Sequence, residues 1–332
     1  MRRLTAAIGI VAAIVSAPTV AFADAAGPTD YLTEITGISP VASGDAFDVD
    51  IVGGDAFVRL RVAPGHEVVV LGYAPHEEPY LRFRADGTVE RNSLSYATYY
   101  NEDRYGRSDI PDTVDTAAAP DWEVVGHGGE YAWHDHRAHW MSEQPLIGLD
   151  PGESLPAETI PLVVDGVDAH VTVVTTLQES PSPLPAVAGT LLGALIGLIA
   201  FGLGRATSVL AGAVLSLVAL VAGLGQFWSL PSSTGPSLAW WLLPAIALTC
   251  STVVIGIYRR SLWTEAGLLA IGGLQLLLWA WQRRGHASRA YVPTDLPVDL
   301  DRMITTAVAA GAMFVVAAAL RPIVAALRSP SA

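Results

Sequence analysis

Five long apolar segments fill the second half of the 332-residue chain, at about 186–204, 206–227, 238–258, 264–282 and 303–325. Each is close to the roughly 20 residues that a helix needs to cross the hydrocarbon core of a bilayer. The composition agrees, because 51% of all residues are hydrophobic and only 15% are charged. The segments predict a domain of five transmembrane helices over residues 186–327, surrounded by a lipid bilayer, with a short cytoplasmic tail at 328–332.

The first 23 residues have the pattern of a secretory signal peptide. A charged start is followed by an apolar run, and Ala21-Phe22-Ala23 fits a small-residue cleavage site. Pro18 interrupts the apolar run just before these small residues, which favours cleavage over an uncleaved anchor. We therefore expect an exported chain whose mature part begins at Asp24.

Charge is divided sharply between two regions of the chain. Residues 24–182 hold 28 of the 32 acidic residues and 8 of the 19 arginines, a balance of −20. Residues 183–332 hold 4 acidic residues and 9 arginines, a balance of +5. The acidic region argues against a nucleic-acid partner, which requires a basic footprint. The division predicts an acidic, water-exposed domain followed by a membrane domain.

Arginines in the connections between the apolar segments predict the orientation of the membrane domain. Those that fall on one side of the predicted bundle are Arg205, Arg259, Arg260, Arg321 and Arg328. The positive-inside rule makes this side cytoplasmic, although Arg283, Arg284 and Arg289 in the opposite loop, 283–302, weaken the pattern. We expect a multi-pass plasma-membrane protein with an extracytoplasmic N-terminal domain and a cytoplasmic C-terminus.

The five apolar segments contain no ionisable residue in their interiors. Glu265, at the start of the fourth segment, is expected at the membrane interface, and His286 in the loop 283–302 is expected below the water-exposed domain. Pathways for ions and protons normally place ionisable side chains within the spans. The pattern therefore favours an anchor or assembly platform over a transporter or channel.

Residues 24–178 alternate short strand patterns with turn signals. The pairs Asp86-Gly87 and Asp165-Gly166 predict the turns of two hairpins, at 79–92 and 158–177. About eight short strands predict an antiparallel β-sandwich, immunoglobulin-like or cupredoxin-like. A proline-rich linker, residues 179–185, then leads into the membrane domain.

A tyrosine-rich segment, residues 93–121, interrupts the strand patterns. Its tyrosines are Tyr96, Tyr99, Tyr100 and Tyr105. They could form an aromatic recognition surface, since long loops are often functional. The alternative, which we favour, is that the segment packs onto the sheet.

One stretch, EYAWHDHRAHWMS at residues 130–142, contains three of the eight histidines of the chain. In an extended strand, His134 and His136 would lie on the same face, and His139 would join them only through a bend. His127 and Met141 are further candidate ligands. The spacing predicts a metal centre formed by His134, His136, His139, Met141 and His127.

The choice of metal follows from the side chains available. Cys250 is the only cysteine, so a cysteine-based metal site and an intramolecular disulfide are both excluded. Histidine with methionine suits copper, and histidine with carboxylate suits zinc, so both remain candidates. The alternative is a structural clasp of hydrogen-bonded histidines. Catalysis by a bound zinc is the weakest interpretation, because no general base or open coordination position can be assigned.

The block YAWHDHRAHWM, together with VVVLGYAPHEEPYLRF and SYATYYNEDRYG before it, resembles a family of exported actinobacterial membrane proteins with a WHDHRxHWM motif. The resemblance covers essentially the whole chain. It implies a signal peptide, a β-domain, a proline-rich linker, a five-helix tail and an extracytoplasmic location. It implies no activity, and it assigns no catalytic residue.

The sequence therefore favours a non-enzymatic cell-envelope protein that presents an acidic β-domain outside the membrane for interaction or assembly with an envelope partner. The alternative is an extracytoplasmic protein that handles copper or zinc through the HDHRAH cluster. The first hypothesis predicts an exposed aromatic patch at the tyrosine-rich segment. The second predicts at least three ligands that converge on one point.

Overall fold

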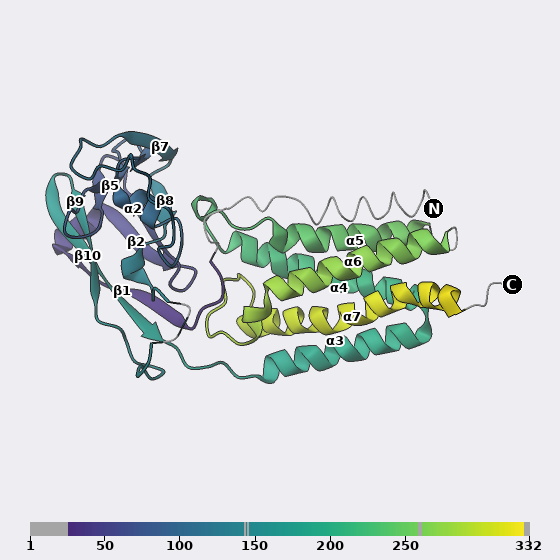
Figure 1. Ribbon diagram of the computed structural model, residues 1–332. Coiled ribbons are helices and arrows are strands. Elements are labelled where there is room, and N and C mark those ends of the chain that lie inside the picture. Colours follow the sequence, from purple (N-terminus) through teal and green to yellow (C-terminus); the bar gives the residue numbers. More distant parts are fainter. Residues whose placement is uncertain (1–25, 143, 145, 258–260, 329–332) are drawn as a thin grey trace.

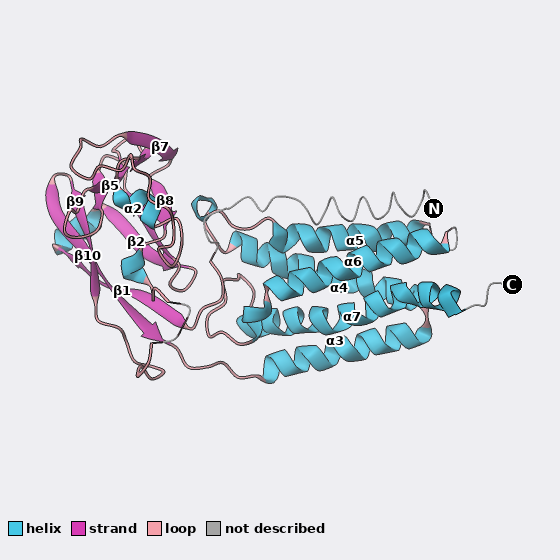
Figure 2. Cartoon of the chain, in the orientation of Figure 1, coloured by secondary structure: helices cyan, strands magenta, loops and turns pink. Residues whose placement is uncertain are grey.

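The computed structural model describes residues 26–142, 144, 146–257 and 261–328. The predicted signal peptide, 1–23, and residues 329–332 of the predicted cytoplasmic tail lie outside the described residues. The described chain forms a mostly antiparallel β-sheet domain, followed by a bundle of five long helices (Figures 1 and 2). The order of the two parts agrees with the prediction.

The β-domain contains two sheets. The larger has the strand order β1-β10-β9-β4-β5-β6-β7, the smaller has the order β2-β3-β8, and neighbouring strands in both are antiparallel. The strands are β1 (Tyr31–Ser39), β2 (Phe47–Val52), β3 (Phe57–Val62), β4 (Val68–Leu71), β5 (Pro79–Phe83), β6 (Val89–Asn92), β7 (Trp122–Gly126), β8 (Glu130–Trp133), β9 (Glu158–Val164) and β10 (Val167–Leu177).

The two sheets share one hydrophobic core. Leu60 of the smaller sheet and Leu81 of the larger sheet are both fully buried in it. The predicted hairpin turns are confirmed, because Asp86-Gly87 joins β5 to β6 and Asp165-Gly166 joins β9 to β10. At the second turn, Asp165 and Gly166 both have positive φ, at 48° and 81°, as a tight two-residue hairpin loop requires.

The tyrosine-rich segment packs against the β-domain. It contains one short helix, α2 (Tyr96–Tyr100), and its four tyrosines are all half-buried. The Tyr99 hydroxyl donates a hydrogen bond to the carbonyl of Ser93. The favoured packing interpretation is confirmed, and the aromatic patch expected for an interaction surface is not fully exposed.

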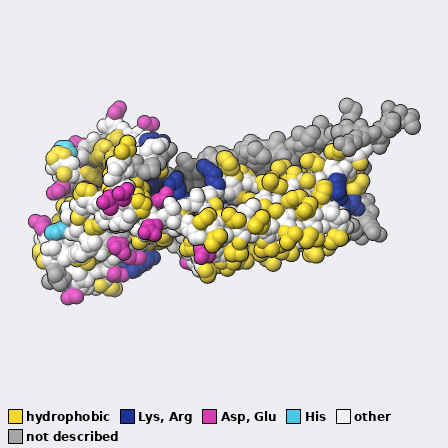
Figure 3. Space-filling model, turned by 90° about the horizontal axis from the view of Figure 1, so that it is seen from below, with side chains coloured by type: hydrophobic (Ala, Val, Ile, Leu, Met, Phe, Trp, Pro, Cys, Tyr) yellow, Lys and Arg dark blue, Asp and Glu magenta, His cyan; other side chains and the backbone are white. Residues whose placement is uncertain are grey.

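All five helices of the bundle are long and apolar enough to cross a membrane. They are α3 (Leu184–Leu203), α4 (Arg205–Trp228), α5 (Ala239–Gly256), α6 (Leu262–Gln282) and α7 (Val298–Arg328). Apolar side chains cover the visible sides of the bundle, whereas acidic side chains gather on the β-domain (Figure 3). We call the end of the bundle next to the β-domain the domain end, and the opposite end the far end (Figure 1).

Glycines bring α3 into close contact with α7. A Cβ atom added at Gly189 would collide with the carbonyl oxygen of Met303, and one added at Gly193 would collide with that of Ala307. Small residues at such four-residue spacing let two membrane helices approach at backbone distance. The close contact of α3 therefore depends on the absence of side chains at these positions.

We expect Gly193→Ala to destabilise the bundle by about 1–3 kcal/mol, because the added methyl group forces the two backbones apart. Gly202→Ala is the matched control on the same helix, since a Cβ atom there meets nothing within 4 Å. Thermal unfolding of the detergent-solubilised protein measures the difference. Equal melting temperatures for the two variants would contradict the close packing of α3 on α7.

The domain end of the bundle contains a buried polar network that the sequence interpretation did not expect. Helix α7 begins at Val298 rather than near 303, so Asp301 is helical and fully buried. Asp301 accepts hydrogen bonds from Arg283 at 2.5 Å and from Nδ1–H of His286 at 2.6 Å. Asp301 lies before the predicted segment 303–325, in the first turn of α7, so it does not contradict the expectation that the span interiors contain no ionisable residue.

The far end of the bundle contains a buried ion pair. Glu265, expected at the membrane interface, lies in the first turn of α6; its side chain is only 1% exposed, and it forms an ion pair with Arg205 at 3.2 Å. The pair joins the start of α6 to the start of α4. Buried carboxylates require such partners because transfer of an unpaired charge out of water is costly.

His286 makes stability depend on pH. Burial, followed by the positive charge of Arg283, lowers the pKa of His286 from 6.5 to about 4. The folded protein therefore keeps this histidine neutral, while the unfolded chain protonates it near pH 6.5. The free energy of unfolding should fall as the pH drops from 6.5 toward 4, by on the order of 3 kcal/mol in total.

The pH effect can be measured from melting temperatures between pH 7 and pH 4.5. We expect His286→Gln to be less sensitive to acid than the wild type over this range. His170→Gln, which changes an exposed histidine of β10, should keep the wild-type slope. Identical slopes for the wild type and His286→Gln would contradict the neutral, buried state of His286.

The β-domain is docked on the domain end by contacts that the linker alone would not provide. Thr29 and Tyr291 form an antiparallel bridge, with N–H to carbonyl distances of 3.1 and 2.8 Å. Asp30 accepts hydrogen bonds from Arg289 and from the backbone N–H of Ala290. An apolar cluster also crosses the junction, and its members from the two parts include Phe57, Ala132, Leu230 and Trp240. Hydrogen bonds, an ion pair and apolar burial thus hold the two parts together.

Candidate functional site

The histidine-rich stretch forms a turn at the end of β8. The strand ends at Trp133, and a 3₁₀ turn follows over His136–Ala138. His134 and His136 therefore do not lie on one extended strand, which the same-face arrangement would require. The turn supplies the bend that His139 needs to join the other two histidines.

Asp135 explains why the chain turns here. Its fully buried carboxylate accepts hydrogen bonds from the backbone N–H of Arg137 at 3.1 Å, from Nε of Arg137 at 2.7 Å and from the indole of Trp133 at 3.0 Å. A short acidic side chain that accepts a backbone N–H two residues later starts a turn in place of a strand. Arg137 also donates to the carbonyl of Gly72, which ties the turn to the larger sheet.

The negative charge of Asp135 at this turn is neutralised by the positive charge of Arg137. Burial alone would raise the pKa of the Asp135 carboxyl, but the charge and hydrogen bonds of Arg137 outweigh burial and leave that pKa below its ordinary value. The Arg137 guanidinium also lies 4.6 Å from the centre of the Tyr73 ring, a cation–π contact. The turn is therefore held as a rigid, charge-paired unit.

The turn brings the three histidine rings of the motif together. The ring centre of His139 lies 5.6 Å from that of His134 and 5.2 Å from that of His136. All three side chains are buried. The three histidines of the motif are therefore neighbours, whereas the metal centre that their spacing predicts stays a prediction.

Hydrogen bonds assign the tautomers of two of these histidines. Nε2 of His136 donates to the carbonyl of Asp103 at 3.0 Å, and Nδ1 of His139 donates to the carbonyl of Trp140 at 3.1 Å. In each neutral ring the other nitrogen is then an acceptor. Nδ1 of His136 and Nε2 of His139 are buried and have no hydrogen-bond partner among the described residues. Two lone pairs are therefore left unused in the cluster.

Burial keeps His136 and His139 neutral. Loss of solvation is the main cause that lowers the pKa of His136, and it lowers the pKa of His139 further. The positive charge of Arg104 also lowers the pKa of both rings. Neutral imidazole is the form that binds transition metals.

The structure does not bring the other two predicted ligands into the cluster. His127 is exposed in the turn between β7 and β8, and β8 separates it from His134. Met141 is half-buried two residues beyond His139. Among the residues that the structure describes, no three His, Cys, Asp or Glu side chains are already arranged to hold one metal ion.

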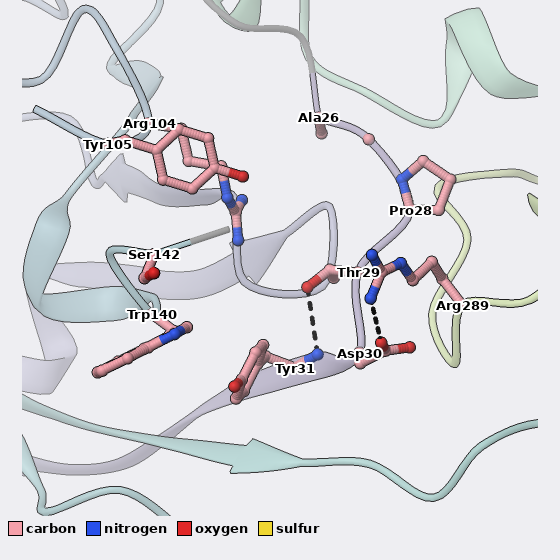
Figure 4. Close-up of a pocket in the computed structure, with 11 residues that line it drawn as sticks. Ala26, Pro28, Thr29, Asp30, Tyr31, Arg104, Tyr105, Trp140, Ser142 and Arg289 are labelled. Atoms are coloured by element: carbon pink, nitrogen blue, oxygen red, sulfur yellow. Dashed lines mark hydrogen bonds and ion pairs between the residues drawn. The ribbon is translucent and has the colours of Figure 1, made fainter. Parts of the chain in front are cut away.

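A cavity of about 250 Å³ lies beside the histidine cluster, at the junction of the β-domain and the bundle (Figure 4). One wall includes Trp140, which follows His139 in sequence, and Arg104, which follows the Asp103 whose carbonyl accepts from His136. The opposite wall contains Asp30 and, from the loop between α6 and α7, Arg289. Parts of the chain that are distant in sequence thus form a single pocket.

Sequence reasoning missed the charged residues of this pocket. Arg104 donates to Asp55, a fully buried residue in the β2–β3 turn. Burial raises the pKa of the Asp55 carboxyl, and the charge of Arg104 offsets only part of that rise. The one signal in the sequence was an aspartate within the apolar run IVGGDAF, where a charge requires a partner.

Comparisons of the chain with protein-family models, with curated proteins and with solved structures found no match. The resemblance based on the WHDHRxHWM motif therefore stays a prediction. The functional interpretation depends on the geometry and chemistry of the molecule itself.

Proposed function

We propose that the protein is anchored in the plasma membrane by its five helices and presents an acidic β-domain outside the membrane for interaction or assembly with an envelope partner. In this proposal the N-terminal domain is extracytoplasmic, the C-terminus is cytoplasmic, and the chain is not an enzyme. The two sheets with one shared core support a β-sandwich, which we propose to be of the immunoglobulin-like or cupredoxin-like type.

The docked junction is the observation that carries the proposal. A domain attached only by residues 179–185 would sample many orientations above a membrane. Here the Thr29–Tyr291 bridge, the Asp30–Arg289 ion pair and the apolar cluster set one orientation. A fixed orientation exposes the same acidic face to every partner that approaches in the plane of the membrane.

Photo-crosslinking in native membranes tests the interaction. A photoreactive residue is placed at Glu158 or Asp168, which are exposed on β9 and β10, and at Leu195 on α3 as a lipid-facing control. We expect a discrete protein adduct from the β-domain positions and none from Leu195. If positions on every exposed face of the β-domain give no adduct, the proposed interaction is contradicted.

Sidedness is tested separately by thiol labelling. The buried native cysteine is first changed to alanine, and Asp168→Cys then provides a single exposed thiol. A reagent that does not cross membranes should label this variant in intact cells. Labelling only after cell lysis would place the β-domain in the cytoplasm and reject an extracytoplasmic role.

Metal handling is a second candidate function, supported by the unused lone pairs of His136 and His139. Metal-bound histidines characteristically donate their second ring nitrogen to a carbonyl or carboxylate, which fixes the ring. Both rings have such a carbonyl partner. Because no three ligands are already placed around one point, the proposal requires the rings, including that of His134, to move when copper or zinc binds.

Calorimetric titration of the full-length protein with Cu²⁺ and Zn²⁺ tests this candidate. We expect stoichiometric binding by the wild type, at least about tenfold weaker binding when His136 or His139 is changed to alanine, and unchanged binding when exposed His170 is changed. A folded wild type that binds neither ion would show that the three histidines are a structural clasp.

A further inference from the structure

The junction pocket has the chemistry of an anion site, and neither proposed function uses it. Its walls combine the two arginines with the aromatic side chains of Tyr105 and Trp140 (Figure 4). The pocket lies at the domain end of the bundle, because Arg289 follows helix α6, which ends at Gln282. In a membrane this position is close to the level of the lipid headgroups.

Both guanidinium groups keep donors available for a ligand. Arg104 donates a hydrogen bond from one terminal nitrogen to Asp55, and Arg289 donates one from a terminal nitrogen to Asp30. In the described part of the chain, the remaining N–H groups of these two arginines make no hydrogen bond to protein. Figure 4 shows the two guanidinium groups on either side of Thr29, at the same cavity. A guanidinium has five N–H donors, so each arginine can pair with its acid and still contact a second group.

Asp30, the acidic residue that lines the pocket, is already satisfied, which argues against a cation as the ligand. Asp30 accepts from Arg289 with one oxygen and from the backbone N–H of Ala290 with the other. Asp55 does not line the pocket: it is fully buried, its Oδ2 pairs with Arg104, and its Oδ1 has no hydrogen-bond partner among the described residues. The groups that the two arginines turn toward a ligand are N–H donors, and their fixed fork matches the oxygens of a phosphate.

We propose that the junction pocket binds a phosphate group through Arg104 and Arg289. The cavity of about 250 Å³ holds roughly eight waters, so it can accept a phosphate with a small substituent. Tyr105 and Trp140 provide apolar surface for that substituent. The source is either the headgroup of a phospholipid or a soluble phosphate ester. The site is independent of a protein partner and of a metal at the histidines.

The soluble source is tested by calorimetric titration of the full-length protein, in a phosphate-free detergent, with inorganic phosphate and with glycerol 3-phosphate. We expect saturable binding of at least one probe by the wild type, weakened by about tenfold or more in Arg289→Gln. Arg289→Lys should bind with intermediate affinity, because it keeps the charge but loses the fork. Arg284→Gln is the matched control, since Arg284 is exposed in the same loop and does not line the pocket.

The lipid source is tested by native mass spectrometry of the same variants. Each is reconstituted in vesicles of phosphatidylglycerol mixed with a phosphate-free galactolipid, and is then released by detergent. Retention of phosphatidylglycerol by the wild type and Arg284→Gln, with loss in Arg289→Gln, would identify a lipid headgroup. Binding of the soluble probes without lipid retention would identify a soluble ester.

Two results would overturn the proposal. One is the absence of both saturable phosphate binding and phospholipid retention in the folded wild type. The other is equal binding by Arg289→Gln and Arg284→Gln, which would assign any phosphate affinity to the general surface. Melting temperatures of all three variants, compared in phosphate-free buffer, establish that a loss of binding does not come from unfolding.

Discussion

Asp301→Asn is expected to lower the stability of the helical bundle by about 3–5 kcal/mol, which is among the largest effects of any single substitution in this chain. Its carboxylate neutralises Arg283, whose side chain is 0% exposed. The asparagine leaves this buried cation without a counter-charge and also weakens the hydrogen bond from His286. Thermal unfolding in detergent should show a drop in melting temperature of roughly 10 °C.

Two further variants test whether the loss of stability comes from the unpaired charge of Arg283 rather than from any substitution in this helix. Asp299→Asn changes an exposed acid in the first turn of the same helix and should have little effect. Asp301→Asn combined with Arg283→Gln should be less destabilised than Asp301→Asn alone, because no unpaired buried charge remains. Equal losses for Asp301→Asn and Asp299→Asn would contradict the buried network.

Asp135→Asn is expected to have a comparable effect in the β-domain. The side chain of Asp135 is 0% exposed and that of Arg137 is 10% exposed, so the substitution leaves another buried cation without its partner. It also weakens the turn that positions the three histidines. We expect a loss of about 3–5 kcal/mol, measured as an earlier unfolding transition of the full-length protein.

A double-mutant cycle tests the cause of this loss. Arg137→Gln in the Asp135→Asn background should recover part of the stability, because both charges are then absent. Asp168→Asn, at an exposed site on β10, serves as the control and should unfold like the wild type. Strictly additive losses for Asp135→Asn and Arg137→Gln would show that the two side chains are not coupled.

The sequence was sufficient to predict the helices and turns that are determined by residues within the same segment. The membrane helices follow from apolar length, so α3, α4, α5 and α6 begin and end within a few residues of the predicted segments. The hairpin at Asp165-Gly166 follows from two residues that accept positive φ. For these helices and this hairpin, the residues that determine the structure lie within the element itself.

The histidine turn was only partly predictable, because a side chain interrupts the strand. The spacing of His134 and His136 was compatible with an extended strand, and nothing in it showed that Asp135 would accept the N–H of Arg137. The clustering of the histidines was still expected, since their closeness in sequence limits how far apart they can lie. Closeness in sequence thus accounts for the proximity of the three rings, but it does not show the local conformation that brings them together.

The junction and the buried network could not be predicted, because their partners are distant in sequence. Asp30 and Arg289 are 259 residues apart, and Thr29 pairs with Tyr291 across a similar separation. Each polar residue looks like an ordinary surface residue when only its neighbours in the sequence are considered. Only the arrangement of the β-domain on the bundle shows that these pairs meet.

The central claim is that the β-domain and the bundle form one body with a fixed relative orientation. The most direct measurement is the distance distribution between spin labels at Asp168 of β10 and Trp263 of α6, in lipid nanodiscs and in a Cys250→Ala background. Both positions are exposed, and they lie in different parts of the molecule. A single narrow distribution is predicted. A broad distribution, as expected for a domain held only by its linker, would contradict the claim.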